Sequence, residues 1–416
     1  MAVRRALVDL TPLRISPAFR RLWIGRVVSS LGGQMTVVAV MFQVWRETGS
    51  TVWTGAVGLA QALPVIAFGL FAGALVDRSD RRRVYLVATA GQALCSVALA
   101  VQGFLGQVPV AVVLALVAAQ SGFVAMGGPA FRSFIPHLLP RENVAAGLAL
   151  NGIAFQAAML VGPALGGLVL GWWGVGGCYL VDAVTFVVAF AGALGLPPMR
   201  PEGEPARPGL GGVLDGLAFL VRDPVVRAAL LTDLALTTLS MPISLFPLVN
   251  AERFGDDPRT LGLFLTAIAV GGVLASLMSG TFTRLSRPGL AMLGGAVVWG
   301  AALALFGLSA NPWAGLAFLA VAGAADTVTV VSRGTLVQLH TPNALLGRVG
   351  AAEQIVGRAG PDVGNMRGGL VADATSGTVA LVSGGVMCVA VVVALGLTTP
   401  ALRRSWRPGD QPTPVT

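Results

Sequence analysis

The sequence predicts an all-α membrane protein with about twelve transmembrane helices, arranged as two halves of six. Of its 416 residues, 55% are hydrophobic and only 11% are charged, whereas about a quarter of an ordinary soluble domain is charged. The apolar residues form runs long enough to cross a bilayer. Basic residues fall between these runs in an alternating pattern, which is typical of multi-pass membrane proteins.

The apolar runs also predict the organisation of the chain. A spanning helix requires roughly 20 mainly apolar residues, and a polar, proline-rich stretch follows the sixth such run. The predicted spans are 21–45, 52–76, 84–105, 108–131, 144–170, 175–196, 226–250, 259–282, 290–309, 313–337, 347–372 and 377–398. The predicted parts are an N-terminal half at 1–196, a cytoplasmic linker at 197–225, a C-terminal half at 226–398 and a cytoplasmic tail at 399–416.

The positions of the arginines predict the orientation. All 28 basic residues are arginine, and twenty-two of them, Arg333 and Arg348 included, are counted on segments that are cytoplasmic if the N-terminus is inside. Short cytoplasmic loops retain basic residues, so both termini are expected in the cytoplasm. The N-terminus lacks the apolar core and cleavage site of a secretory signal, and we expect it to be retained. The remaining arginines are Arg46, Arg253 and Arg259 in outer loops, and Arg26, Arg358 and Arg367 within spans.

The two halves resemble each other in sequence. Pro140 and Pro342 precede the fifth and eleventh spans, and the tripeptide GGL recurs at 166–168 and 368–370 with the same offset. Two six-helix repeats with a site between them are typical of repeat-built transporters.

The linker between the halves carries an apolar stripe. It consists of Leu214, Leu217 and either Leu220 or Val221. This pattern predicts a helix lying on the inner membrane face. A plain extension of the seventh span is the alternative.

Several other classes of protein are disfavoured. A nucleic-acid partner would require a basic, aromatic-rich soluble surface, whereas the arginines here lie in short connections. The cysteines Cys95, Cys178 and Cys388 are widely separated within apolar spans and support neither a disulfide framework nor a zinc site. His137 and His340 lie in loops, and no nucleotide-binding loop or nucleophile motif occurs. We therefore expect no enzyme activity, cofactor, metal or nucleic-acid partner.

The most specific motif is the loop after the second span, GALVDRSDRRRV at 73–84. Asp77 is expected at the C-terminal end of a helix, where the macrodipole disfavours an anion, so its carboxylate requires an arginine or a helix N-terminus as a partner. The pattern G-x-x-x-D-R-x-x-R-R resembles the signature loop of the major facilitator superfamily. A cluster of arginines that only sets the orientation is the alternative.

This resemblance implies the major-facilitator fold and a cytoplasmic conformational switch. In the superfamily the matching Asp contacts the start of the eleventh helix and an Arg at the end of the fourth. The second glycine of the family's loop corresponds here to Asp80, so a different turn geometry is expected. The implied switch residues are Gly73, Asp77, Arg78, Arg81, Arg82, Arg132 and Arg348.

The fifth span contains the run GPALGG, in which the relevant residues are Gly162, Pro163, Gly166 and Gly167. A proline removes one backbone donor, and glycines allow close helix approach. The run resembles the core of the antiporter motif of exporters, with Ala149 and Ala158 at its two upstream glycines. The resemblance implies a hinge in an exporter, and generic close packing is the alternative.

Ionisable residues inside apolar spans are costly and suggest function by default. Asp326 has no opposite charge within one helical turn and is the first candidate for a proton-exchanging group, followed by Glu353. Asp182 resembles an Asp of the macrolide-efflux-like branch, with an inter-helix hydrogen-bond anchor as the alternative. Arg358 and Asp362 have the spacing of a structural ion pair. The coupling candidates are Asp326, Glu353, Asp182, Asp233, Arg26, Arg358 and Asp362.

Longer strings narrow the resemblance within the superfamily. The stretches at 9–26, 49–55, 287–293 and 338–349 resemble the enterobactin (siderophore) exporter-like branch. The resemblance implies secondary active export of a siderophore or similar metabolite by proton antiport. Multidrug or macrolide efflux is the alternative within the same branch. A passive facilitator and a non-transporting membrane sensor are the alternatives from other classes.

A substrate pocket would be lined by polar and aromatic side chains of the spans. The candidates are Gln34, Gln61, Gln120, Asn151, Phe155 and Gln156, together with Trp53. Hydrogen bonds between helices are the alternative role for these side chains. We expect a monomer in the bacterial cytoplasmic (inner) membrane, with the lipid bilayer, a small-molecule substrate and protons as partners.

Overall fold

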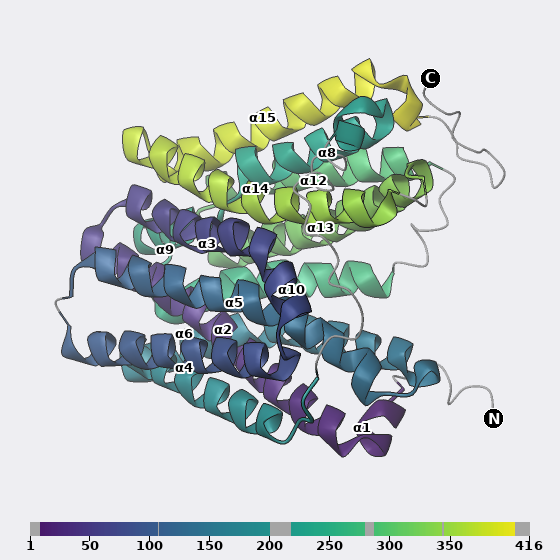
Figure 1. The fold of residues 1–416 in the computed structure, drawn as a ribbon. Helices are drawn as coiled ribbons and strands as arrows, with labels where there is room; N and C mark the ends of the chain where they lie inside the picture. The colour runs from purple at the N-terminus through teal and green to yellow at the C-terminus, as the bar shows by residue number, and fades with distance from the viewer. Residues whose placement is uncertain (1–8, 107, 200–217, 279–286, 343–344, 404–416) are drawn as a thin grey trace, which may run out of the picture. The chain divides into compact units, whose positions relative to one another are not determined.

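The regular elements of the computed structural model are helices (Figure 1). It describes residues 9–106, 108–199, 218–278, 287–342 and 345–403; for 69–78 and most positions from 346 to 358 it describes the backbone alone. Within these residues every regular element is helical, and 10 helices are long and apolar enough to cross a membrane. One of these ten helices, α6, contains two predicted spans. The helix α14 is not one of the ten, and it coincides with the predicted span 347–372. The prediction of an all-α fold with about twelve spans is confirmed.

The first of two compact units comprises Met1–Glu47 and Ala60–Pro208. The backbone of α6 leaves the helical conformation at Gly174, where φ is 67°. A residue with a side chain rarely adopts this angle, so Gly174 allows the turn between the predicted fifth and sixth spans. The helices of this unit are α1 (Thr11–Ile15), α2 (Pro17–Thr48), most of α3 (Thr51–Arg78), α4 (Arg81–Leu105), α5 (Val110–Leu138), η2 (Arg141–Asn143) and α6 (Val144–Leu194).

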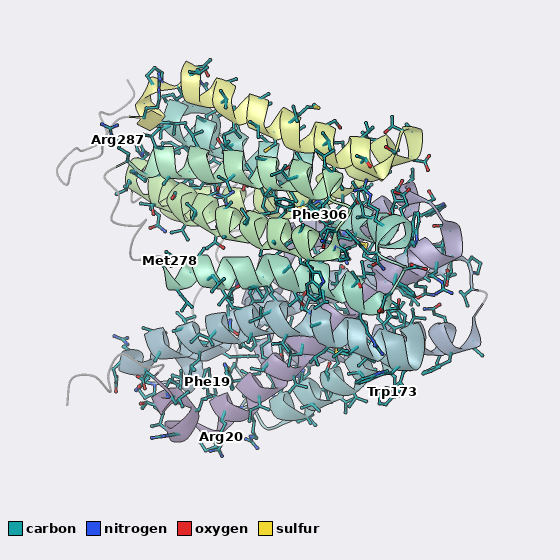
Figure 2. All side chains as sticks on the ribbon, turned by 180° about the vertical axis from the view of Figure 1, so that it is seen from behind. Phe19, Arg20, Trp173, Met278, Arg287 and Phe306 are labelled. Atoms are coloured by element: carbon teal, nitrogen blue, oxygen red, sulfur yellow. The ribbon has the colours of Figure 1, made fainter. Side chains whose placement is uncertain are left out.

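A buried hydrophobic cluster joins α2, α4 and α5 within this unit. Phe19, labelled in Figure 2, and Leu22 belong to the same cluster as Tyr85 and Phe134, and none of the four is more than 4% exposed. The rings of Tyr85 and Phe134 meet edge to face with their centroids 5.4 Å apart. Such pairs favour one relative orientation of the helices that carry them.

The second unit comprises Thr48–Leu59 and Gly209–Thr416. Within it, α12 packs against both α13 and α15, as Figure 1 shows. Phe306, labelled in Figure 2, meets the rings of Phe246 and Phe264 edge to face. The helices of this unit are α8 (Pro224–Leu234), η3 (Ala235–Leu239), η4 (Ile243–Leu245), α9 (Phe246–Arg253), α10 (Pro258–Leu277), α12 (Pro288–Leu308), α13 (Pro312–His340), α14 (Leu346–Ala374), α15 (Gly377–Thr398) and η5 (Pro400–Arg403).

Three helices of the second unit, α8, α10 and α13, begin at a proline that follows a capping residue. The capping side chains belong to Asp223, Asp257 and Asn311, and each accepts a hydrogen bond from a backbone N–H of the first turn. Proline fits the first helical position because its missing N–H would have no partner there, and the cap satisfies one of the N–H groups that follow. The sequence thus encodes these helix starts locally.

The predicted seventh span is interrupted. α8 continues into the π-helix η3, and regular structure stops after Ser240 before η4 begins. Pro242 cannot donate a backbone hydrogen bond. Arg367 of α14 donates to the carbonyl of Leu239, and the indole of Trp299 donates to the Ser240 hydroxyl at 2.9 Å. Side chains of neighbouring helices therefore satisfy polar groups at the break, as lipid-embedded structure requires.

The start of α3 packs within the second unit. The Thr51 hydroxyl donates to the carbonyl of Gly369 at 2.7 Å, and the Thr54 hydroxyl donates to that of Ser244 at 2.9 Å. The backbone N–H of Ser244 in turn donates to Asn365 Oδ1 at 3.1 Å. These hydrogen bonds, all between segments distant in sequence, connect the start of α3 with η4 and α14.

Only the end of the predicted linker helix lies in the described part of the chain. Residues 218–222 are helical, and the chain bends at Asp223 before α8 begins. Leu220 is buried against side chains of α8 and α13, whereas Val221 is exposed. Outside the described residues are Leu214 and Leu217. The interfacial helix therefore stays a prediction.

Candidate functional site

Asp80 organises the loop between α3 and α4. Its Oδ1 accepts hydrogen bonds from the backbone N–H groups of Arg82, at 3.0 Å, and of Met199, at 3.1 Å. Asp80 thus caps the N-terminus of α4 and connects it to the segment after α6. A glycine at this position could make neither hydrogen bond.

Two of the predicted switch arginines have partners within the first unit. Arg82 Nη2 donates to the carbonyl of Leu194 at 2.6 Å. Arg81 Nη1 lies 3.3 Å from His137 Nε2, and His137 Nδ1 lies 2.8 Å from the carbonyl of Ser133. The Arg81 side chain therefore connects the start of α4 with the last turn of α5.

The central contact of the predicted switch falls outside the described side chains. The backbones of Gly73, Asp77, Arg78 and Arg348 are helical, and their side chains are not described. Arg132, which the resemblance pairs with the loop carboxylate, is exposed near the end of α5. The conformational switch therefore stays a prediction.

The GPALGG run brings α6 against α2. A Cβ on Gly166 would lie 2.9 Å from Met35 Cα, and a Cβ on Gly162 would meet the side chain of Gln34. Only glycine permits so close an approach of two helices. Pro163 and Gly167 of the run are buried as well. Close packing of this run is thus observed, and its role as a hinge stays a prediction.

Asp182 occupies a buried polar cluster to which four helices contribute. Its side chain is 0% exposed, and Oδ2 lies 2.7 Å from Ser96 Oγ of α4 and 3.3 Å from Gln120 Nε2 of α5. Thr36, on α2, and Thr185, on α6, lie beside the carboxyl group, and the Thr185 hydroxyl donates to the backbone carbonyl of Asp182 at 2.7 Å. The structure therefore brings together a predicted coupling residue and a predicted pocket residue, Asp182 and Gln120.

A second polar cluster of the first unit was not identified from the sequence. Gln43 and Gln102 exchange hydrogen bonds of 2.8 and 3.0 Å between their side-chain amides. Tyr179 donates to Gln43 Oε1 at 2.7 Å, and Gln43 Nε2 donates to Glu47 at 2.6 Å. Glutamines inside apolar spans are the signal that points to such contacts, because a buried amide requires partners.

In the second unit, Arg333 of α13 bridges acidic residues of two other helices. It pairs with Asp233 of α8, and its Nε lies 3.1 Å from Glu353 Oε1 of α14. Asp326, two turns earlier on α13, lies within the electrostatic field of Asp233 and Arg333. Two predicted coupling acids, Asp233 and Glu353, therefore share one guanidinium group, and a third, Asp326, lies on the same helix as that group.

Arg333 is a largely buried arginine near the end of α13. The arginine distribution counts it with the cytoplasmic segments, and it lies inside α13, about two turns before the end at His340, with its side chain only 12% exposed. Burial between acidic partners retains it within the helix. Its seven-residue spacing from Asp326 places both residues on one helix face and was the available signal.

The remaining coupling candidates are Arg26, Arg358 and Asp362. The guanidinium of Arg26 lies over the ring of Phe131, 5.1 Å from its centroid. α14 approaches the start of α3 so closely at Asp362 that a Cβ on Gly58 would lie 3.2 Å from Asp362 Cα. The side chain of Arg358 is not described, so its predicted pairing with Asp362 stays a prediction.

The remaining pocket candidates differ in exposure. Phe155 and Gln156 are exposed on α6, and Trp53 is exposed on α3. The half-buried ones are Gln34, Gln61 and Asn151. A pocket lined by these residues stays a prediction.

Comparison with known proteins assigns the chain to a family. Residues 8–407 match the transmembrane secretion effector family. The chain is 30% identical over 397 residues to the enterobactin exporter of Shigella boydii serotype 18, with 94% of both chains covered. The enterobactin exporter of Escherichia coli O139:H28 has the same identity and coverage.

Solved transporter structures share the fold. A peptide transporter of the POT family in complex with alafosfalin has a TM-score of 0.74 at 12% identity, covering 94% of this chain and 95% of that one. The nucleoside transporter NupG has a TM-score of 0.72 at 15% identity, with 93% and 100% covered. A bacterial homologue of the human lysosomal transporter Spinster has a TM-score of 0.70 at 16% identity, with 96% and 100% covered. At such low identity the likeness concerns the fold alone. The chain belongs to the transmembrane secretion effector family and is a multi-pass transporter of the major-facilitator type, not an enzyme.

Proposed function

We propose that the protein is a secondary active exporter that moves a siderophore, or a related aromatic and polyhydroxylated metabolite, out of the cytoplasm. The similarity to enterobactin exporters, which extends over 94% of both chains, carries this proposal. The GPALGG run supports export, since it resembles the antiporter motif and packs α6 tightly on α2. The protein works as a monomer in the inner membrane, with both termini in the cytoplasm.

Proton antiport drives this export by alternating access. The coupling groups are Asp326 and the two acids that share Arg333, Asp233 and Glu353. One guanidinium neutralises the charge of one carboxylate, and a charge inside the membrane is costly without compensation. Binding and release of a proton therefore change which acid pairs with Arg333, and this exchange links proton movement to the rearrangement of α8, α13 and α14.

The cargo is tested in a deletion strain grown under iron limitation. We expect less siderophore in the medium, more in the cytoplasm, and recovery with the wild-type gene. Tolerance to macrolides and other drugs is measured in parallel. Normal siderophore secretion with new drug sensitivity would instead identify a multidrug pump and overturn the proposed cargo.

Coupling is tested in proteoliposomes that carry an imposed pH gradient. The combined substitutions Asp326→Asn and Glu353→Gln should abolish proton-driven uptake of the cargo into inverted vesicles. Exchange of the cargo without a pH gradient should persist. Glu142→Gln, at an exposed acid of η2, is the matched control and should transport like the wild type. Undiminished proton-driven transport in the double variant would exclude these acids as the coupling groups.

A further inference from the structure

The buried cluster around Asp182 contains a hydroxyl group with two acceptors. Ser96 Oγ lies 2.7 Å from Asp182 Oδ2 and 3.1 Å from the backbone carbonyl of Gln92, one turn earlier on α4. The amide of Gln120 donates to Ser96 Oγ at 3.0 Å. The Ser96 hydroxyl has a single proton, so it can donate to only one of these two oxygens at a time.

The two directions of this hydroxyl match the two protonation states of Asp182. When the carboxylate is ionised, Ser96 donates to Oδ2. When Oδ2 carries a proton, the carboxyl group donates to Ser96 Oγ, and the Ser96 hydroxyl turns to the Gln92 carbonyl. Gln120 donates to Ser96 Oγ in both cases. Both states therefore use the same heavy-atom positions, and loading a proton requires only a hydroxyl rotation.

The surroundings of the second carboxylate oxygen of Asp182, Oδ1, favour the neutral state of this side chain. Asp182 Oδ1 and Thr36 Oγ1 are both buried, and the Thr36 hydroxyl lies beside the carboxyl group without a hydrogen bond of ordinary geometry to it. Gly32 brings the backbone of α2 against this oxygen, since a Cβ there would lie 2.7 Å from Oδ1. An ionised carboxylate with one weakly compensated oxygen is costly to bury, and protonation removes its charge.

The charged groups of the surrounding helices do not neutralise Asp182 in the described residues. On α6, the adjacent titratable groups are Cys178 and Tyr179. On α2, Arg26 lies over an aromatic ring and Glu47 accepts from an amide. α4 after its first turn and α5 before its last two turns contain no Asp, Glu, Arg or His. A proton is therefore the ligand that fits this carboxyl group.

We propose that Asp182, Ser96 and Gln120 form a proton-binding site in the first unit, separate from the acids around Arg333, in which rotation of the Ser96 hydroxyl accompanies loading and release. Asp182 binds the proton, and Ser96 and Gln120 are positioning residues. The use of this site in transport rests on the proposed antiport, whereas proton binding itself does not require a cargo.

The test is infrared difference spectroscopy of the purified full chain in lipid nanodiscs, recorded between acid and alkaline pH. We expect a carboxylic C=O band that disappears as the pH rises, and we expect Asp182→Asn to lack this band. An unchanged band in a folded Asp182→Asn protein would overturn the proposal. Because no cargo is present, this result is independent of whether siderophore export fails.

Ser96→Ala tests the hydroxyl rotation and stays informative if the Asp182 variant does not fold. It removes the hydrogen bond that compensates the ionised carboxylate, so the band should persist at alkaline pH where the wild type has lost it. The matched control is Thr89→Ala, on the same helix, whose buried hydroxyl donates to the carbonyl of Tyr85 at 2.8 Å. If the carboxylic band of Ser96→Ala disappears over the same pH range as that of the control, the proposed role of Ser96 is excluded.

Discussion

At the scale of single residues, buried polar groups of this protein find their partners on other helices. Arg333 links α13 to Asp233 of α8 and Glu353 of α14. The sequence identifies each acid as unusual, because charges inside apolar spans are costly. It does not identify their common partner, since no sequence spacing relates residues on three different helices.

Removing the Arg333 side chain should destabilise the second unit. Arg333→Ala leaves two acids without their counter-charge, and breaking a buried ion pair costs about 3–5 kcal/mol. We expect a marked fall in the melting temperature of the purified protein, measured by intrinsic fluorescence. Arg259→Ala, at an exposed arginine, is the control. Combining Arg333→Met with Asp233→Asn and Glu353→Gln should restore part of the loss, and the absence of any recovery would contradict an effect of unpaired charge.

A methyl group on Gly166 should disturb the contact of α6 with α2. Gly166→Ala places a Cβ 2.9 Å from Met35 Cα, and the backbone cannot yield as the end of a side chain would. Overpacking of this kind costs about 1–3 kcal/mol. Gly152→Ala, on the same helix, has nothing within 4 Å of its new Cβ and should be neutral. Equal melting temperatures of the two variants would show that the helices separate without cost.

At the scale of elements, local signals in the sequence explain several helix starts. The Asp-Pro and Asn-Pro pairs before α8, α10 and α13 predict a capped first turn from neighbouring residues alone. The interruption of the seventh span is different. Pro242 indicates a break, but Arg367 and Trp299, which satisfy polar groups there, come from other helices.

The cap at the start of α4 gives a test at this scale. Asp80→Ala removes the acceptor for the N–H groups of Arg82 and Met199 and should cost about 0.5–2 kcal/mol. Asp80→Asn keeps a side-chain oxygen and should retain most of the stability. Thermal unfolding and the rate of proteolysis after α6 are the measurements. If the alanine and asparagine variants behave alike, the hydrogen bonds of Asp80 do not organise this loop.

At the scale of the whole molecule, the arginine distribution predicts the orientation in the membrane. Reporter fusions after residue 199 and at the C-terminus should report the cytoplasm, and a fusion after Gly49 should report the outside. Arg46, near that outer connection, is a weak topogenic signal against the many arginines of the inner segments. A cytoplasmic signal from the fusion after Gly49 would contradict the predicted topology.

The sequence by itself determined the class of protein, the approximate spans and the family. These features depend on composition, on the length of apolar runs and on motifs formed by neighbouring residues. Only the tertiary structure decided which buried groups meet: Asp182 with Ser96 and Gln120, and Arg333 with its acids. The physical reason is that burial in lipid requires every polar group to be compensated, and in these clusters the compensating partners lie on different helices.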